Sequence, residues 1–208
     1  MSNRREPLVP NQIFHVYNHA NGRDNLFAND GNYTHFFRKY AEYLFPIFGT
    51  FAYCLLPNHY HFLIRVKETE ALWNVLDPKG FRKPLGSDLA NWLAHRVGTL
   101  QNAYAKAFNI QQKRKGSLFI QSFCRKPVDN PDYYFNVLRY IHANAVHHDF
   151  VTGLDDWPFS SYHTYLSKKP SKLAREEAVS WCGGFAAFKE LHLLPVAETL
   201  GMDMEDFS

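Results

Sequence analysis

Apolar and polar positions alternate along the chain with two different periods, and these periods divide it into strands and helices. The short runs 13–17, 50–55 and 59–66 are rich in β-branched and aromatic residues, which is typical of β-strands, and we predict a further strand at 117–125. In the run 59–66 every even position is apolar and should face the core. The opposite face of this strand then carries His59, His61, Leu63 and Arg65.

Two segments before residue 110 have apolar residues spaced three and four apart, which predicts helices. The first covers about 32–45, and the second covers about 87–108, with Ser87 as its N-cap. Between the strand at 59–66 and this second helix, residues 67–86 contain prolines and glycines and show no clear period.

A third long helix should begin after Asn130, because an N-cap asparagine followed by Pro131 is a strong start signal. The predicted order is strand, helix, strand, strand, helix, strand, helix. This order favours the α+β class, with a ferredoxin-like antiparallel sheet. We expect 1–150 to form this core and 151–208 to form a C-terminal extension packed on it, with a short helical piece near 185–191.

The composition adds little beyond a globular fold. Hydrophobic residues make up 46% of the chain and charged residues 21%, which is ordinary for a globular protein. The net charge of +3 points only mildly toward a polyanionic partner. Three cysteines without a C-x-x-C pair favour neither a disulfide framework nor a structural zinc site. Neither a signal peptide nor a membrane-spanning apolar run is visible, so we expect a cytoplasmic protein without membrane contact.

Basic residues cluster on both sides of the strand predicted at 117–125. They could neutralise DNA phosphates, or they could simply form a solvated basic turn. Phe119 and Phe123 could stack on bases, although alternation along a strand favours a place in the core. The basic candidates are Lys113, Arg114, Lys115, Arg125 and Lys126.

His59 and His61 are two residues apart on a predicted strand, so both imidazoles leave the same face. Two ring nitrogens on one rigid face are a plausible start for a metal site. The spacing alone is a weak signal, because the chain contains 11 histidines. A zinc hydrolase is one interpretation, and it would need further His or Asp ligands downstream.

The third helix carries Tyr140 and Asn144 one turn apart, so both side chains can point into one site. Taken singly, the tyrosine could be a core ring and the asparagine a polar residue near the helix end. Together with the two histidines they suggest covalent catalysis. A phenol with a pKa of about 10 is a poor nucleophile at neutral pH, and a nearby divalent cation would favour the phenolate and polarise a phosphodiester. Two imidazoles and an amide oxygen suit Mg²⁺ or Mn²⁺.

Four segments in order resemble the REP-associated tyrosine transposases, which belong to the HUH single-tyrosine superfamily. The segment LPNHYHFL is similar to their motif of two histidines around a hydrophobic residue, and KGSLF to their Gly-Ser/Thr-Leu-aromatic segment. RYIHAN resembles their tyrosine helix, and WPFSSY a marker that follows it. These segments occupy 56–63, 115–119, 139–144 and 157–162, and the resemblance as a whole covers about 13–165.

The resemblance implies an enzyme that cleaves and rejoins single-stranded DNA containing an imperfect hairpin, as in transposition of an insertion sequence. It implies Tyr140 as the nucleophile, which would form a covalent 5′-phosphotyrosine intermediate. It also implies Mg²⁺ or Mn²⁺ as the cofactor, with His59, His61 and Asn144 as metal ligands. Relatives act as monomers or as homodimers, and the sequence favours neither.

The chain departs from the family after Asn144, where it has Ala-Val-His-His instead of the usual Pro-Val-Arg. A basic contact is lost there, and His147 could replace it as a DNA-phosphate contact or could be a surface histidine at the helix end. Two other functions stay open. One is a non-catalytic, domesticated DNA- or RNA-binding protein, and the other is a metal-dependent hydrolase without a covalent intermediate, which would tolerate Tyr140→Phe.

Overall fold

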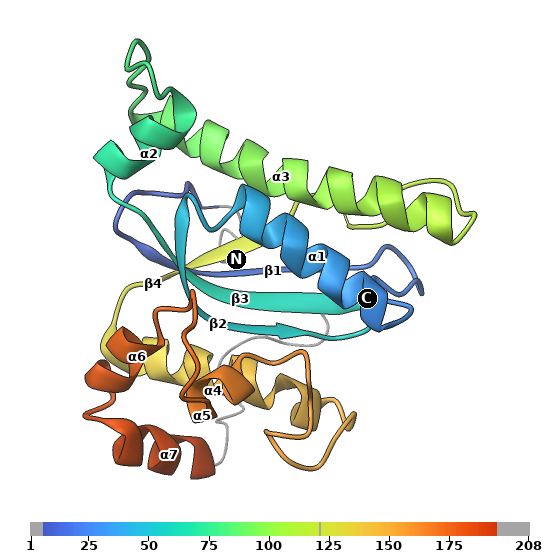
Figure 1. Cartoon of the computed structure of the whole chain (residues 1–208), viewed down its shortest axis with the longest axis vertical. Coiled ribbons are helices and arrows are strands. Elements are labelled where there is room, and N and C mark those ends of the chain that lie inside the picture. Colours follow the sequence, from blue (N-terminus) through green and yellow to red (C-terminus); the bar gives the residue numbers. More distant parts are fainter. Residues whose placement is uncertain (1–5, 121, 195–208) are drawn as a thin grey trace.

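The computed structural model describes residues 6–120 and 122–194, which form one antiparallel sheet with helices on both faces (Figure 1). The four strands lie in the order β2-β3-β1-β4, and every neighbouring pair is antiparallel. The elements are β1 (Ile13–His19), α1 (Asp30–Tyr43), β2 (Phe48–Leu55), β3 (His59–Val66), α2 (Thr69–Leu76), α3 (Gly86–Gln111), β4 (Cys124–Val128), α4 (Pro131–His147), α5 (Tyr162–Leu166), α6 (Arg175–Trp181) and α7 (Phe185–Leu193). The α+β class and the ferredoxin-like arrangement are confirmed.

Two hydrophobic clusters lie on the two faces of the sheet. Helices α1 and α3 cover one face, and α4 covers the other (Figure 1). The even positions of β3 belong to the cluster under α1 and α3, whereas Leu63 packs with the apolar residues of α4. The predicted alternation of β3 is therefore confirmed, although the odd face is covered as well. His59 and His61 consequently lie between the sheet and α4, where side chains are largely screened from water.

Helix α4 begins where the sequence predicts. The Asn130 side chain accepts a hydrogen bond from the backbone N–H of Tyr133 at 2.8 Å, and Pro131 occupies the first turn. The expected cap of α3 is wrong, because this helix begins at Gly86 and Ser87 lies inside it. Gly86 has a φ of 54°, a conformation that glycine adopts readily and that turns the chain into the helix one residue early. Helix α2, within 67–86, is a further element that the sequence pattern did not reveal.

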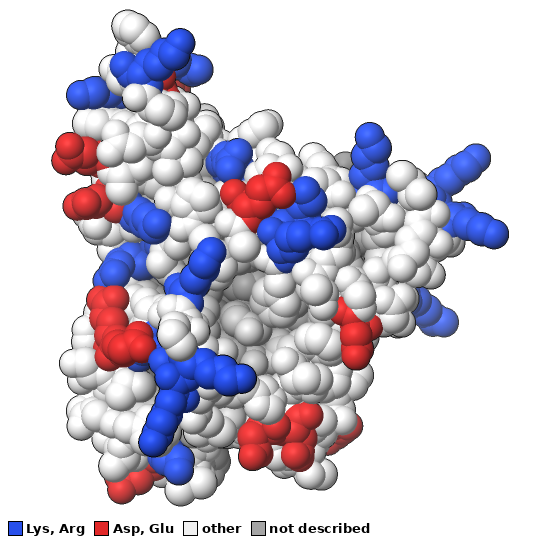
Figure 2. Space-filling model, viewed as in Figure 1, with Lys and Arg blue, Asp and Glu red and all other residues white. Residues whose placement is uncertain are grey.

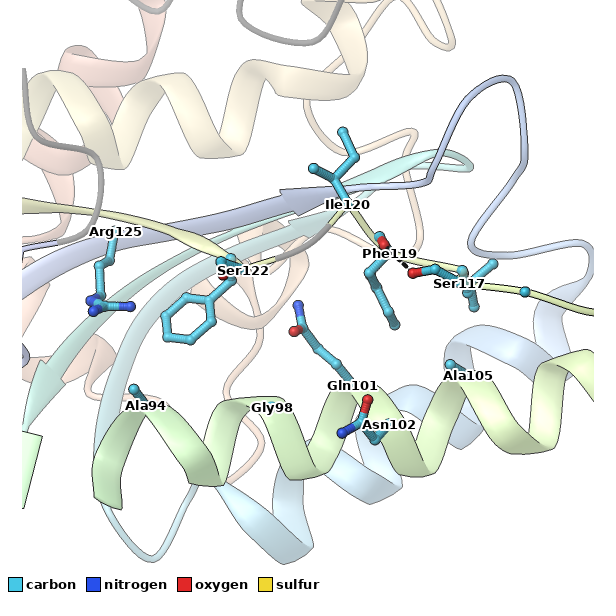
Figure 3. Close-up of a pocket in the computed structure, with 13 residues that line it drawn as sticks. Ala94, Gly98, Gln101, Asn102, Ala105, Ser117, Phe119, Ile120, Ser122 and Arg125 are labelled. Atoms are coloured by element: carbon cyan, nitrogen blue, oxygen red, sulfur yellow. Dashed lines mark hydrogen bonds between the residues drawn. The ribbon is translucent and has the colours of Figure 1, made fainter. Parts of the chain in front are cut away.

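The strand predicted at 117–125 is wrong for most of its length, since β4 begins only at Cys124. The preceding residues 116–120 and 122–123, here called the strap, run back alongside α3 (Figure 3). Phe119 forms only a single bridge to Ala20, and Ser122 has a φ of 63°, which a regular strand does not tolerate. Leu118, Phe119 and Phe123 of the strap are buried in the cluster under α1 and α3 instead, so Phe119 and Phe123 are core residues as the sequence favoured.

Part of the stretch 151–194 lies along the outer edge of β2, between about 159 and 174. The backbone N–H of Leu55 donates to Phe159, that of Ser161 donates to Tyr53, and that of Ala174 donates to Thr50, at 2.8–3.0 Å. The predicted extension, 151–208, includes 195–208, which lie outside the described residues. Its boundary at residue 150 stays a prediction.

A chain of hydrogen bonds also joins α7 to α4 through buried histidines. His192 Nδ1 donates to the Phe188 carbonyl at 2.8 Å, so its Nε2 is an acceptor and faces His142 Nδ1 at 2.8 Å. His142 Nε2 in turn lies 2.8 Å from the Ser161 hydroxyl. Each ring nitrogen in this chain has a partner of the required kind, so one tautomer of each histidine satisfies it.

In the part of the chain that the structure describes, no helix is both long and apolar enough to cross a membrane. All three cysteines are unpaired.

Candidate active site

The candidate site lies between the face of β1 and β3 that carries the histidines and helix α4. Antiparallel pairing sets His19 opposite His59 and Tyr17 opposite His61. Because side chains alternate along a strand, His15 leaves β1 on this same face. Asn144 and Tyr140 reach the face from α4.

The structure brings together the four residues proposed for chemistry. His59 Nε2 lies 3.1 Å from Asn144 Oδ1, and the ring of His61 meets the ring of Tyr140 edge-on at 5.4 Å between centroids. The two histidine rings are 5.1 Å apart. His59, His61 and Asn144 are buried, whereas Tyr140 is half-buried and so remains reachable from solvent.

The contact between His59 and Asn144 brings two lone pairs toward each other. Both ring nitrogens of His59 face amide oxygens, which can only accept, and a neutral ring has one proton to donate. Nδ1 is the closer, at 2.8 Å from the side-chain oxygen of Asn58, so we place the ring proton on Nδ1. Nε2 then presents a lone pair to Asn144 Oδ1, which is itself an acceptor. The amide nitrogen of Asn144 is buried and has no hydrogen-bond partner among the described residues. An imidazole nitrogen and an amide oxygen arranged in this way fit a shared cation.

His61 is positioned by a second histidine. His15 is fully buried, and its Nε2 lies 2.9 Å from His61 Nδ1. Burial lowers the pKa of His15 to about 3 and holds the pKa of His61 well below its usual range, so both rings are neutral at pH 7. A neutral ring that shares Nδ1 with a neighbour has only Nε2 for a further ligand. This arrangement resembles outer-sphere partners that orient metal-binding histidines.

The third candidate metal ligand, after His59 and His61, is the amide oxygen of Asn144 rather than a carboxylate or another histidine. Within residues 6–120 and 122–194, no group of three or more His, Cys, Asp and Glu side chains could hold a metal ion. Burial lowers the pKa of His59 to about 3, so this imidazole is also neutral at pH 7 and can act as a ligand. Two neutral imidazoles and the oxygen of Asn144 therefore fit a divalent cation with open positions.

The phenol of Tyr140 is protonated at neutral pH. Burial raises its pKa to about 12, and the neighbouring side chain of Asn144 acts in the opposite direction. Tyr140 therefore needs additional positive charge nearby before it can act as a nucleophile. Such a charge would lie close to it if a cation occupied the donors of His59 and His61.

Three histidines near the site were not singled out from the sequence. His15 and His19 could have been found, because they alternate with Tyr17 on the strand that pairs with β3. His148 lies with its ring 4.8 Å from that of His59, which no local pattern indicates. His147 is exposed, and its ring is 6.4 Å from that of Tyr140.

The basic residues do not form one group. Lys113 and Lys115 are exposed in the turn after α3, while Arg114 between them bonds to Asp24 and Asn109. Figure 2 shows Lys and Arg side chains projecting at that end of α3, whereas both signs mix elsewhere on this face.

On β4 the two basic residues face opposite sides of the sheet. Lys126 pairs with His15 and lies on the histidine face, with its Nζ 5.2 Å from the centre of the Tyr133 ring. Arg125 pairs with Val16, leaves on the other face, and its Nε donates to the carbonyl of Glu6.

No family model matches the chain. A Haemophilus influenzae protein described as a REP-associated tyrosine transposase is 24% identical over an alignment of 125 positions, which covers 56% of this chain and 60% of the relative. The match thus spans less than two thirds of that relative. A solved structure of a REP-associated tyrosine transposase bound to a REP hairpin has a similar fold, with a TM-score of 0.56 and 18% identity, over 82% of this chain and 89% of that chain. The resemblance of this chain to the REP-associated tyrosine transposases is therefore confirmed.

Proposed function

We propose that this protein cleaves and rejoins single-stranded DNA, with Tyr140 as the nucleophile and a divalent cation, Mg²⁺ or Mn²⁺, bound by His59, His61 and Asn144. The observation that carries the proposal is the convergence of these four side chains from β3 and α4. The lone pairs of His59 Nε2 and Asn144 Oδ1 lie only 3.1 Å apart, which favours a cation between them. The similarity to REP-associated tyrosine transposases supports the same chemistry.

In the proposed reaction the phenolic oxygen of Tyr140 attacks the phosphorus of a phosphodiester. A bond from this oxygen to phosphorus forms, and the bond from phosphorus to the 3′ oxygen of the preceding nucleotide breaks. The phenol gives up its proton to solvent as it attacks, one strand end becomes a 5′-phosphotyrosine, and the other leaves as a 3′ hydroxyl after taking up one proton. One phosphate ester replaces another, so a 3′ hydroxyl can reverse the reaction without an external energy source.

The protein's residues prepare this step. Asn144 contacts the phenol from one turn further along α4, and His15 holds the ring of His61 in one orientation. A bound divalent cation would supply the positive field that favours the phenolate and stabilises charge on the phosphate. The shielding by α4 keeps the imidazoles neutral, as ligands must be.

The substrate is proposed to be a hairpin with a single-stranded flank. The solved structure with a similar fold was determined bound to a REP hairpin, which supports this class of DNA. Lys113 and Lys115, exposed at the end of α3, and Lys126, beside the histidines, are proposed to contact phosphates. His147, exposed near Tyr140, is proposed to do the same. The remaining predicted contacts, Arg114 and Arg125, are held by protein partners and would contribute mainly to the local positive potential.

The test is a denaturing gel of labelled hairpin oligonucleotides, taken from DNA flanking the gene, after incubation with protein and Mn²⁺. We expect a covalent DNA–protein adduct that disappears in Tyr140→Phe and with EDTA. Tyr133→Phe is the matched control, since it removes a hydroxyl from the same helix that bonds to no described residue. Cleavage that persists in Tyr140→Phe without an adduct would instead identify a non-covalent hydrolase. Binding without cleavage under all conditions would identify a non-catalytic DNA-binding protein.

A further inference from the structure

A cavity of about 660 Å³ lies between α3 and the strap, on the opposite face of the sheet from the histidines (Figure 3). Its size is within the range of small-molecule sites, about 300–1,000 Å³. Ala94, Gly98 and Ala105 of α3 form a floor of small residues, and the rings of Phe119 and Phe123 form an inner wall. A thin planar group could lie between this floor and this wall.

Gly98 keeps the floor open although nothing in the packing requires glycine. A Cβ at this position would have no heavy atom within 4 Å, apart from its own helix and chain neighbours. Glycine is the least favourable residue in a helix interior after proline, so a helix selected only for stability would carry alanine here. Glycine at position 98 therefore preserves space in the cavity at the expense of helix stability.

Gln101 supplies an acceptor that lacks a donor. Its side chain is 7% exposed, and its Nε2 donates to the hydroxyl of Tyr60 at 2.7 Å. Its carbonyl oxygen makes no hydrogen bond with any described residue. In Figure 3 the Gln101 side chain extends from α3 toward the strap, into the cavity. An acceptor that lines the cavity and has no donor among the described residues can receive a hydrogen bond from an N–H group of a ligand.

The rim adds polar groups and a positive charge. Asn102, Ser117 and Ser122 line the opening and are exposed, as is the apolar side chain of Ile120. Arg125 also lines it, with its guanidinium carbon 5.0 Å from the centre of the Phe123 ring. Lys126, the next residue of β4, lies on the histidine face. A nucleic-acid strand that crosses this edge of the sheet could therefore reach both the cavity and the candidate active site.

We propose that this cavity binds one unpaired base of the single-stranded DNA flank, with its plane between the floor and the wall and an N–H group donating to Gln101. The inference rests on the proposed function for its substrate class. A nucleobase combines the required features, because it is planar, largely apolar on its faces, has N–H donors on its edge and is joined to a phosphate that Arg125 attracts.

Equilibrium binding of labelled DNA, measured by fluorescence anisotropy in EDTA and in a Tyr140→Phe background, tests the cavity without any cleavage. We expect Gly98→Leu, which fills the cavity with a good helix former, to weaken binding of a hairpin with a single-stranded flank about tenfold or more. Binding of the same hairpin without the flank should change less than about twofold. Gly98→Ala is the matched control, and it should raise the melting temperature while changing affinity for either DNA less than about threefold.

The position of the bound base is found by replacing each flank nucleotide in turn with an abasic one. One abasic position should weaken binding to the parent protein and have no effect on binding to Gly98→Leu, because that variant has already lost the pocket. Equal binding of flanked DNA by Gly98→Leu and its parent, with Gly98→Leu folded by circular dichroism, overturns the inference but leaves the proposed function intact. If the parent binds neither DNA, the DNA-binding part of the proposed function fails as well.

The acceptor role is tested by Gln101→Leu, which keeps the volume of the side chain but removes its carbonyl. The preference for a normal over an abasic nucleotide at the identified position should fall about fivefold, the usual value of one neutral hydrogen bond. Tyr60→Phe is the control, since it removes the other partner of Gln101 and should leave that preference unchanged. An unchanged preference in Gln101→Leu would contradict the assigned hydrogen bond.

Discussion

Helix α4 lies between two clusters of buried histidines that differ in how their hydrogen bonds are completed. On the side of α7, His142 and His192 form a chain in which each ring nitrogen has a matching partner, ending at the Phe188 carbonyl and the Ser161 hydroxyl. On the side of the sheet, His15 Nδ1 and Asn144 Nδ2 have no partners among the described residues. There, His59 and Asn144 also face each other with lone pairs.

This difference separates a structural from a functional use of the same residue type. A buried polar network that is fully satisfied fixes one arrangement and contributes to stability. Buried atoms that lack partners cost free energy, and a folded protein tolerates them where a ligand completes them. We therefore interpret the His142–His192 cluster as a structural anchor of α4, and the histidines of the sheet as the proposed cation site.

The largest expected effect is the loss of metal binding in His59→Leu. Outer-sphere partners already account for about 10–100-fold in metal affinity, so removal of a direct ligand should cost more than about 100-fold for Mn²⁺. Isothermal titration calorimetry of the protein without DNA measures this affinity. His163→Leu, which removes an exposed histidine, should bind Mn²⁺ as the unaltered protein does. If His59→Leu retained its affinity, the cation would have to lie elsewhere.

For the free energy of unfolding we expect the opposite ranking, with a larger loss in the His142–His192 cluster than at His59. His142→Leu leaves His192 Nε2 without its donor, and an unsatisfied buried group costs about 1–3 kcal/mol, so the free energy of unfolding should fall by about 2–3 kcal/mol. In EDTA, His59→Leu should cost less than about 1 kcal/mol, because it also removes the opposed lone pairs. Urea denaturation gives both values. Equal losses in the two variants would remove the distinction between the clusters.

His15→Leu should weaken Mn²⁺ binding about 10–100-fold although His15 itself is not proposed as a ligand. Without its partner at Nδ1, His61 can turn and change tautomer, so a smaller fraction of molecules presents Nε2 to the cation. His15→Gln, which keeps a polar group near this position, should recover part of the affinity. A His15→Leu variant with unaltered affinity would show that the contact between the two histidines only fills space.

The smallest expected effect is the loss of stability at acidic pH that comes from the buried His142–His192 cluster. Burial, opposed by a hydrogen bond to the Phe188 carbonyl and assisted by the nearby charge of Arg139, lowers the pKa of His192 to about 4. The unfolded chain takes up this proton near pH 6.5. The stabilisation by neutral His192 is therefore complete above pH 6.5 and is lost as the pH falls toward 4.

Thermal denaturation between pH 7 and pH 4 measures this loss, and the melting temperature should decrease with falling pH. The decrease should be shallower by a few degrees in His142→Leu/His192→Leu, which has no imidazole to protonate at this point. Parallel curves for the double variant and the unaltered protein would assign the acid sensitivity to other groups, such as the histidines of the sheet.

Local signals in the sequence were sufficient for the parts of the site that lie on single elements. The alternation of β3 placed His59 and His61 on one face, and the start of α4 after Asn130 fixed the spacing of Tyr140 and Asn144. These features depend on the backbone period of one segment and on caps within it, which neighbouring residues determine.

Alternation along β1 could have placed His15 on the correct face, but which distant side chain each residue contacts depends on pairing between segments, and no local pattern gives that pairing. His15 contacts His61 because β1 and β3 pair in one register, and His142 meets His192 across 50 residues. The strap was mistaken for a strand because burial beside α3 gives it a short run of apolar and aromatic residues, as in a strand. In this case tertiary packing, rather than strand pairing, determined which residues were apolar.

The contacts that residues 151–194 make along β2 also affect how the protein behaves at high concentration. An uncovered outer strand offers its N–H and C=O groups to any other extended chain, and such strands nucleate aggregation. Here Phe159, Ser161 and Ala174 occupy those groups on β2. At the opposite edge, β4 is only five residues long and contains Pro127, which lacks an N–H. A chain shortened to 1–150 should therefore aggregate through β2, even though it would keep every residue proposed for catalysis.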